Sequence, residues 1–368
     1  MLGWPPSGAL AEARRRQYIA RRVRIAILTG GGDCPGLNAV IRAVVRRATQ
    51  HNLDVVGLRD GWNGLLETRF MPLNRETTAG ILHRGGTILG TSRVNPFKVP
   101  GGPQAVLRTM AGHSLSAVVA IGGEGTLSAA TRMHAEHGLP VVGIPKTIDN
   151  DLGGTDVSFG FDSAVAIATE AIDRLHSTAE SHKRVLVCEV MGRHAGWIAT
   201  YAGLAGGADV VLVPEVPVDL AQVAEHLRNR HAGRVDFSVV VVAEGTRVRA
   251  SESETEHLIT KGALDEAGRP RLGGVGAYVA EEIEKRTGFE TRVTVLGYLQ
   301  RGGSPTAYDR VLASRFGVHA CDMVVNGEFG HMAALQGNRV VSVPLAEATR
   351  ELKRVPKDFL AVARVFFG

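Results

Sequence analysis

Six short runs dominated by valine and isoleucine constrain this chain more than any other feature. Each run is followed by a glycine-rich or polar loop and then by a helical pattern. Nearly unbroken β-branched runs suit strands that are buried on both faces, and the intervening helices predict parallel sheets covered by helices. The runs are residues 23–28, 115–121, 140–144, 184–190, 209–214 and 237–243.

Length and composition are those of an ordinary globular protein. The chain has 368 residues, 44% of them hydrophobic and 21% charged, which is long enough for two domains. No apolar run approaches the roughly 18 residues that span a bilayer, so we expect a cytoplasmic location. Cys34, Cys188 and Cys321 lie far apart and lack metal-ligand spacing, which predicts reduced thiols.

The net charge of +5 is concentrated in the first 22 residues. Five arginines and one glutamate there give +4, leaving about +1 for the rest of the chain. A basic face for nucleic acid is therefore not expected. The Pro/Gly-rich start of this segment predicts a disordered arm over residues 1–22.

The loop after the first run begins with three glycines, Gly30 to Gly32. Glycine lets backbone N–H groups approach an anion closely, and the helix expected to start near Gly36 directs its N-terminus at the same place. Ligands of open parallel sheets bind at the carboxyl ends of the strands. The loop matches neither standard phosphate motif, so by itself it fits a phosphate cradle or a simple turn.

Two further loops add carboxylates and a hydroxyl. In "IGGEGT" (121–126), Glu124 would repel a phosphate unless Mg²⁺ lies between them, and otherwise it is a solvated turn residue. In "PKTIDND" (145–151), Lys146 and Thr147 precede Asp149, which is a candidate general base. The three loops together favour phosphoryl transfer to a hydroxyl.

Several arginines stand beside glycines or at strand ends, which suits the binding of anionic phosphates. The sequence has no G-x-S-x-G elbow and no metal-type His or Cys cluster, so nucleophilic hydrolysis and zinc chemistry lose support. The arginines are Arg84, Arg93, Arg184, Arg193, Arg292 and Arg301.

Six ordered motifs resemble those of a bacterial-type 6-phosphofructokinase: "LTGGGDCPGLNAVIR", "GGTILGTSR", "IGGEGT", "PKTIDND", "EVMGR" and "TVLGYLQRGGSP". The resemblance runs from Val23 to past Arg310. It implies transfer of the ATP γ-phosphoryl group to the 1-hydroxyl of fructose 6-phosphate, a committed step of glycolysis. It also implies an α/β fold of two stacked doubly wound, Rossmann-like domains with the active site in the cleft between them.

The expected organisation has four parts. Residues 1–22 form the arm, 23–160 mainly bind the donor, and 161–310 mainly bind fructose 6-phosphate. Residues 311–368 are expected as C-terminal helices that pack back on the first domain. Because the resemblance begins at Val23, and a GTG start codon would read as valine, we expect residues 1–22 to be absent from the native protein.

The resemblance also implies the site residues. Asp149 would take the proton of the sugar hydroxyl, with Thr147 and Arg193 as further catalytic residues, Asp151 helping to organise the site, and Glu124 as the Mg²⁺ ligand. The donor would be bound by Gly32, Arg93, Val94, Gly123, Glu124, Gly125 and Thr126. The substrate would be bound by Thr147, Ile148, Asp149, Arg184, Met191, Gly192, Arg193, Glu244, Arg292, Tyr298, Leu299, Gln300 and Arg301. Arg184 and Arg292 would come from a neighbouring subunit, which implies at least a dimer and favours a homotetramer.

The donor signature is mixed. Pyrophosphate users of the family resemble one another in having Asp at the position of Gly125 and Lys at that of Lys146, whereas ATP users commonly have Gly at both. An Asp at position 125 would set a carboxylate against the α-phosphate of ATP, so Gly125 favours ATP. Pyrophosphate is the alternative donor.

Regulation and other functions are further expectations. In the family, residues such as Arg42 and Arg46 help to bind a phosphorylated effector, and Asp209 lies near an effector-bound metal. His176 stands where regulated members often have Arg, so the usual effector response is not expected. The GGEGT loop also resembles the GGDG loop of NAD kinases, and a sugar-phosphate-sensing paralogue is the binding-module alternative.

Overall fold

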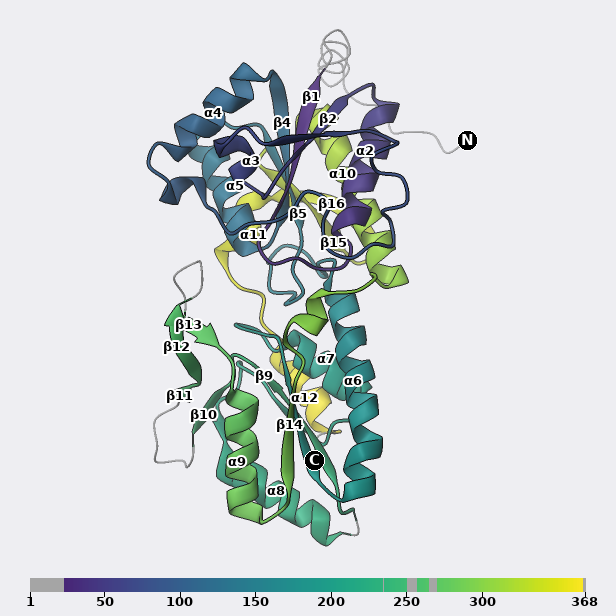
Figure 1. The fold of residues 1–368 in the computed structure, drawn as a ribbon, viewed down its shortest axis with the longest axis vertical. Coiled ribbons are helices and arrows are strands. Elements are labelled where there is room, and N and C mark those ends of the chain that lie inside the picture. The colour runs from purple at the N-terminus through teal and green to yellow at the C-terminus, as the bar shows by residue number, and fades with distance from the viewer. Residues whose placement is uncertain (1–22, 234, 250–256, 265–269, 367–368) are drawn as a thin grey trace. The chain divides into compact units, whose positions relative to one another are not determined.

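The structure, a computed structural model, describes residues 23–233, 235–249, 257–264 and 270–366. They form two compact units (Figure 1). Unit 1 contains the described residues up to Thr147, together with Leu152–Gly160 and Gly302–Glu351. Unit 2 contains Ile148–Asp151, Phe161–Arg301 and the described residues from Leu352 onward.

Unit 1 is built on a seven-stranded sheet in the order β16-β15-β5-β4-β1-β2-β3. The strands are parallel except for β3 and β16, which are antiparallel to their neighbours. Their bounds are β1 (Arg24–Gly30), β2 (Asp54–Leu58), β3 (Phe70–Leu73), β4 (Leu115–Gly122), β5 (Val141–Pro145), β15 (His331–Gln336) and β16 (Arg339–Pro344).

Helices cover both faces of this sheet. In Figure 1, α2 and α10 lie side by side on one face, and α3, α4, α5 and α11 cover the other. Gly317 of α10 allows the close approach to α2, because a Cβ there would lie 2.7 Å from the Ala43 Cβ. The bounds are α2 (Leu37–Gln50), α3 (Asn63–Leu66), η1 (Pro96–Lys98), α4 (Gly102–Gly112), α5 (Glu124–His137), α10 (Ala307–Asn326) and α11 (Leu345–Arg350).

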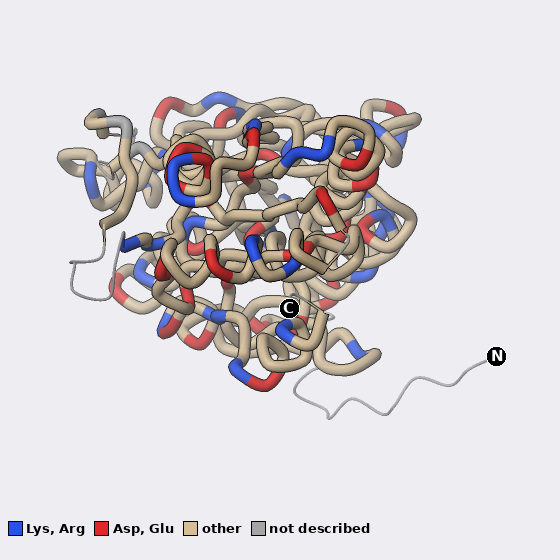
Figure 2. Tube along the Cα trace, turned by 90° about the horizontal axis from the view of Figure 1, so that it is seen from below, with Lys and Arg blue, Asp and Glu red and all other residues tan. Residues whose placement is uncertain are grey.

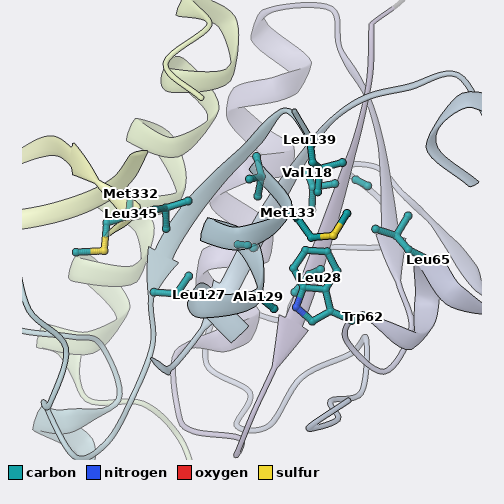
Figure 3. Close-up of a cluster of buried hydrophobic side chains, with 14 of the residues drawn as sticks. Leu28, Trp62, Leu65, Val118, Leu127, Ala129, Met133, Leu139, Met332 and Leu345 are labelled. Carbon is teal, nitrogen blue, oxygen red and sulfur yellow. The ribbon is translucent and has the colours of Figure 1, made fainter. Parts of the chain in front are cut away.

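The main apolar core of unit 1 lies between the sheet and the α4–α5 layer. Figure 3 shows Met133 of α5 beside Leu28, Val118 and Trp62, while Leu127 of the same helix lies on the side of Leu345. All six side chains are at most 2% exposed. At about 25 cal/mol per Å² of buried apolar surface, such side chains contribute the main stabilising term of the unit. The sheet that this core supports places the carboxyl ends of β1, β4 and β5 side by side.

Unit 2 is built on a four-stranded parallel sheet in the order β14-β6-β9-β7. Helices α6 and α7 pack together on one face, and α8 and α9 pack together on the other (Figure 1). The bounds are α6 (Phe161–His182), β6 (Val185–Val190), α7 (Trp197–Ala205), β7 (Val210–Leu212), α8 (Leu220–Ala232), β9 (Ser238–Ala243), α9 (Val275–Thr287), β14 (Thr291–Val295), η2 (Gly297–Arg301) and α12 (Lys357–Arg364).

Two small sheets complete unit 2. One has the order β11-β10-β8 and the other pairs β12 with β13. Their strands are β8 (Val218–Asp219), β10 (Arg247–Arg249), β11 (His257–Leu258), β12 (Thr260–Leu264) and β13 (Pro270–Leu272).

The predicted α/β class with largely parallel sheets is confirmed, and all six predicted runs form strands. The expected C-terminal part differs in two ways. Residues 331–344 form the hairpin β15–β16 rather than helices. Residues from Leu352 onward belong to unit 2, because Phe359 of α12 packs on Trp197 and Tyr201 of α7. The proposed binding functions of the domains stay predictions, and the arm at residues 1–22 lies outside the described residues.

In the view of Figure 2, the Lys/Arg and Asp/Glu positions of the described residues are interspersed rather than gathered on one side. None of the helices in the described residues has the length and apolar character to cross a membrane. The three cysteines are buried thiols. Burial raises the pKa of Cys188 and that of Cys321 to about 12.

Candidate active site

Three of the predicted loops meet at one edge of the unit 1 sheet. Because β5, β4 and β1 are consecutive parallel neighbours, their carboxyl ends lie side by side. The loops that follow them begin at Gly31, Gly123 and Lys146. The grouping that the sequence predicted for these loops is therefore present within unit 1.

The opening loop is held by its backbone. Gly31 has a φ of +81°, a conformation that favours glycine. Its N–H donates to the Ser92 carbonyl at 2.9 Å, and its carbonyl accepts from the Thr91 Oγ1 at 2.6 Å. These bonds bring Thr91 and Ser92 against the loop, and exposed Arg93 and half-buried Val94 follow them in the chain.

Close packing explains two of the glycines at this edge. A Cβ on Gly30 would lie 2.5 Å from the Thr126 Oγ1, and one on Gly122 would lie 2.4 Å from the Thr126 Cβ. Thr126 is 6% exposed and fills the space between the two loops. Its side chain is therefore a spacer between the loops.

Glu124 and Gly125 begin α5, where backbone N–H groups and the helix dipole favour an anion. Glu124 is exposed, and its Oε1 accepts a hydrogen bond from the Ser128 Oγ at 3.1 Å. A Cβ on Gly125 would meet no atom within 4 Å, so open space lies beside this residue.

The chemistry of Glu124 fits Mg²⁺. Proteins commonly hold Mg²⁺ through one or two carboxylates together with substrate phosphates and water. Among the described residues, no group of three or more His, Cys, Asp or Glu side chains could hold a metal by itself. A single exposed carboxylate at a helix N-terminus matches the arrangement in which substrate phosphates and water supply the other Mg²⁺ ligands.

Lys146 lies under the opening loop. Its side chain is 3% exposed, and its Nζ donates a hydrogen bond to the Gly32 carbonyl. Its backbone N–H donates to the Gly122 carbonyl at 3.0 Å. The next residue, Thr147, is half-buried, and a Cβ on Gly123 would lie 3.9 Å from the Thr147 Cβ. Lys146 thus links all three loops.

Unit 2 has its own group of predicted residues at the carboxyl ends of β6 and β9. Gly192 has a φ of +141°, and a Cβ on Gly245 would lie 2.0 Å from the Arg193 carbonyl. The Glu244 N–H donates to the Val190 carbonyl at 2.9 Å, and the Gly245 N–H donates to the Gly192 carbonyl at 3.1 Å. The structure therefore locks Glu244 beside the loop that carries Arg193.

The segment after β14 joins this group. Gln300 is fully buried, and its Oε1 accepts from the Met191 N–H at 3.2 Å. Its Nε2 donates to the Gly297 carbonyl at 3.2 Å. Gln300 thus has a structural contact, whereas Tyr298 and Leu299 are 81% and 67% exposed.

Arg193 borders a pocket of about 400 Å³ within unit 2. Its Nη2 donates to the Pro270 carbonyl at 2.6 Å, a contact that no sequence pattern indicated. Arg247 and Arg354 line the same pocket, and the carboxylate of Glu215 there accepts hydrogen bonds from the Gly196 and Val355 N–H groups. The lining is therefore suited to anions.

Arg184 and Arg292 do not join this group within one chain. Arg184 precedes β6, so the strand separates it from Met191 by roughly 20 Å. Both arginines pair with Glu290, at 2.7 Å and 2.5 Å. The hydrogen bond from Arg184 is the largest cause of the lowered pKa of Glu290.

Asp149, the predicted base, lies in the third loop within Ile148–Asp151, a stretch that belongs to unit 2. Ile148 is 1% exposed, Asp149 is half-buried, and Asn150 and Asp151 are buried. Asn150 has a φ of +50°. The stretch is therefore a constrained turn rather than an open loop.

The residues considered for regulation have local partners. Asp209 accepts from the Arg230 Nη2 at 2.6 Å and from the Val239 N–H at 2.8 Å. His176 Nε2 lies 2.6 Å from the Gly206 carbonyl oxygen. Arg42 and Arg46 are half-buried on α2. The expected roles of these four residues stay predictions.

These features define an α/β protein in which each of the two main sheets carries, at the carboxyl ends of its strands, a group of residues suited to an anion. A family model described as phosphofructokinase matches residues 24–324. The chain therefore belongs to the phosphofructokinase family, as its motifs indicated. The alternative of an NAD kinase has no support from this match.

Curated relatives and solved structures agree on the family. The chain is 54% identical to a pyrophosphate–fructose 6-phosphate 1-phosphotransferase of Streptomyces coelicolor over 94% of this chain and 100% of that one. It is 51% identical to an ATP-dependent 6-phosphofructokinase of Mycobacterium bovis over the same shares. Phosphofructokinase from Saccharomyces cerevisiae matches with a TM-score of 0.76 and 31% identity over 94% of this chain, which spans 46% of that longer chain.

Proposed function

We propose that the chain transfers a phosphoryl group from ATP to the 1-hydroxyl of fructose 6-phosphate, giving fructose 1,6-bisphosphate and ADP. This reaction commits hexose phosphate to glycolysis. The observation that carries the proposal is the meeting of three loops at the ends of β1, β4 and β5, the last of which continues into Asp149. Phosphoryl transfer asks the protein mainly to position its reactants and to stabilise charge.

Each edge has its own part in this mechanism. The backbone N–H groups at Gly32 and at the start of α5 bind the donor phosphates, and Arg93 lies near the transferring group. Met191, Gly192, Arg193 and Glu244 bind the sugar phosphate. Asp149 accepts the proton of the 1-hydroxyl as the oxygen attacks, while Thr147 and Ile148 orient the substrate.

Glu124 would hold Mg²⁺ together with the donor phosphates. The ion neutralises developing charge on the phosphate oxygens when it is bound. The hydrogen bond from the Ser128 hydroxyl orients the carboxylate of Glu124 at the helix start, which supports this role.

Open space beside Gly125 supports ATP as the donor. No atom lies within 4 Å of a Cβ built at this residue, so no neighbouring side chain obstructs a ligand there. An acidic side chain at the same place would put like charges together. The proposal of ATP rests on this residue.

Pyrophosphate is the second candidate donor, and Lys146 favours it. Its buried ammonium group lies at the opening loop, where it would add a positive charge near a compact anion. Curated relatives named for pyrophosphate and for ATP resemble the chain to similar degrees.

The test is formation of fructose 1,6-bisphosphate from fructose 6-phosphate and Mg²⁺ with a single donor present. Activity with ATP and not with pyrophosphate supports the proposal. Activity with pyrophosphate alone would show that Lys146 determines the donor and would contradict the assignment of ATP. Absence of activity with both donors would contradict the assignment of fructose 6-phosphate as the acceptor.

The substrate site also supports a homo-oligomer, at least a dimer and by the resemblance a tetramer. Arg184 and Arg292 lie at the opposite end of β6 and β14 from Met191, so a second copy would have to supply them. The edge strand β14 exposes Val293 and Val295, an apolar surface suited to association. A cytoplasmic location completes the proposal.

A further inference from the structure

The C-terminal segment that follows α11 is bonded to the turn that carries Asp149. The Lys353 N–H donates to the Asp151 carbonyl at 2.9 Å. The Lys353 Nζ donates to the Asn150 Oδ1 at 2.9 Å. A single residue, about 200 positions away in the chain, therefore contacts both residues that directly follow Asp149.

Asn150 is the point at which this turn is most constrained. It is 3% exposed and has a φ of +50°, in the left-handed region that residues other than glycine rarely adopt. Asn tolerates this region better than most residues, and its amide can be held from outside the turn. The hydrogen bond from Lys353 fixes the amide of Asn150, and this constrains the backbone conformation directly after Asp149.

Lys353 is itself held in place by α7. Its carbonyl accepts from the Trp197 Nε1 at 2.9 Å, and its Nζ lies 5.5 Å from the centroid of the Trp197 ring. Phe359 of α12 stacks on the same ring with centroids 6.4 Å apart. Trp197 therefore contacts both the backbone carbonyl and the ammonium group of Lys353, and these contacts hold the ammonium group in position to reach Asn150.

The same segment reaches the loop of Arg193. The Val355 N–H donates to the Glu215 Oε1 at 3.0 Å. Both oxygens of Glu215 accept from the Gly196 N–H at 3.0 Å. Gly196 lies three residues after Arg193. Residues 353–355 thus connect the turn of the proposed base to the loop of the proposed substrate arginine.

We propose that Lys353 is a positioning residue for Asp149 and acts through Asn150. The inference rests on the proposed role of Asp149 as the base. An ammonium–amide bond at a buried left-handed residue keeps the carboxylate in one orientation, and a displacement of about 1 Å in a reacting group can cost about hundredfold in rate. Because we assign substrate affinity to other residues, we expect loss of the Lys353 contact to lower kcat rather than to raise KM.

The test compares Lys353→Met with Lys353→Arg and with the control Lys357→Met. Methionine keeps an unbranched stem of similar length and removes the charge, whereas arginine keeps a donor. Lys357 is an exposed lysine of the same C-terminal region. We expect Lys353→Met to lower kcat by about tenfold or more with KM for fructose 6-phosphate within about twofold. Lys353→Arg should recover most of kcat, and Lys357→Met should resemble the parent protein.

A second variant keeps the proposal testable if Lys353→Met does not fold. Asn150→Gly retains access to a positive φ and removes the whole side chain, including the amide that Lys353 contacts. We expect it to lower kcat as Lys353→Met does, and the double variant to be no worse than the poorer single variant. Additive losses, an effect on KM alone, or an unchanged kcat in either single variant would overturn the inference.

Asp149→Ser separates this inference from the proposed function. If Asp149→Ser abolishes turnover and Lys353→Met does not alter it, only the positioning role fails. If Asp149→Ser keeps near-normal turnover, the assignment of the base itself fails, and the positioning role fails with it.

Discussion

The two proposed binding edges present different groups to a ligand, mainly backbone groups in unit 1 and charged side chains in unit 2. At the edge of unit 1, glycines and backbone N–H groups form the surface, and Thr126 fills the space between two loops. At the edge of unit 2, the groups offered to a ligand are side chains such as Arg193 and Glu244, held by backbone bonds behind them. Function at the first edge should therefore be sensitive to added atoms, and function at the second to removed charges.

Asp149 belongs to neither group of binding residues, because its proposed role is that of the general base. We expect Asp149→Ser to lower kcat by about 10²–10⁴-fold, since a positioned general base contributes that much, while KM changes little. Steady-state kinetics with fructose 6-phosphate checks this. A variant with kcat close to that of the parent would remove the assignment of the base.

Removal of a charge from the substrate side should have the next largest effect. We expect Arg292→Ala to raise KM for fructose 6-phosphate by about tenfold or more, because a charge-assisted bond to phosphate is lost. Exposed Arg174, which pairs with Glu170 on α6, provides the control substitution Arg174→Ala.

A mixture of two variants that are each impaired at the substrate site tests where Arg292 acts. If Arg292 serves a neighbouring copy, hybrids of Arg292→Ala with Glu244→Ala contain some intact sites, and mixed subunits should regain activity. Lack of recovery in proven hybrids would argue against a shared site.

Addition of a carboxylate to the donor side should change donor choice. We expect Gly125→Asp to reduce turnover with ATP by about tenfold, because like charges would meet at the donor phosphates, and to spare any turnover with pyrophosphate. The open position makes the substitution sterically harmless. Gly112→Asp is the matched control, since a Cβ there also meets no atom within 4 Å.

Addition of a methyl group at Gly30 should strain the same edge. The new Cβ would lie 2.5 Å from the Thr126 Oγ1, so we expect Gly30→Ala to lower the free energy of unfolding by about 1–3 kcal/mol. Denaturant unfolding measures the change. The double variant with Thr126→Ala, which removes the obstructing hydroxyl, should recover part of the loss, and equal instability of both proteins would contradict the packing argument.

The smallest effect concerns the pair of arginines on Glu290. Since the folded pKa of Glu290 is lowered by Arg184, the stability it contributes is present above about pH 4.3 and is lost as the pH falls through the folded pKa. We expect Glu290→Gln to lower Tm slightly at pH 7 and not at pH 3. A constant difference across this range would show that the pair is not the cause.

Sequence reasoning was most successful where local pattern and local structure coincide. The six β-branched runs became strands, and the helix expected near Gly36 begins at Leu37 after a left-handed Gly36. It was less successful beyond the motifs. The hairpin β15–β16 pairs next to β5, a long-range contact that no local pattern indicates, and it replaced expected helices.

The site shows the same division. Glycines followed by helix patterns predicted the three loops of unit 1, because strand ends and helix starts are local features. Lys353, Glu215 and Pro270 had no such signal, since each acts through a contact with a residue distant in the chain.

The sequence by itself determined the parallel α/β class, the family and the candidate residues for the chemistry, because β-branched runs, glycine loops and ordered motifs are properties of short stretches. Only the tertiary structure decided that Thr126 is a buried spacer, that Arg184 lies at the far end of β6 from Met191, and that Lys353 holds the turn of Asp149. These are consequences of packing and chain reversal, which bring distant residues together at distances that no local pattern encodes.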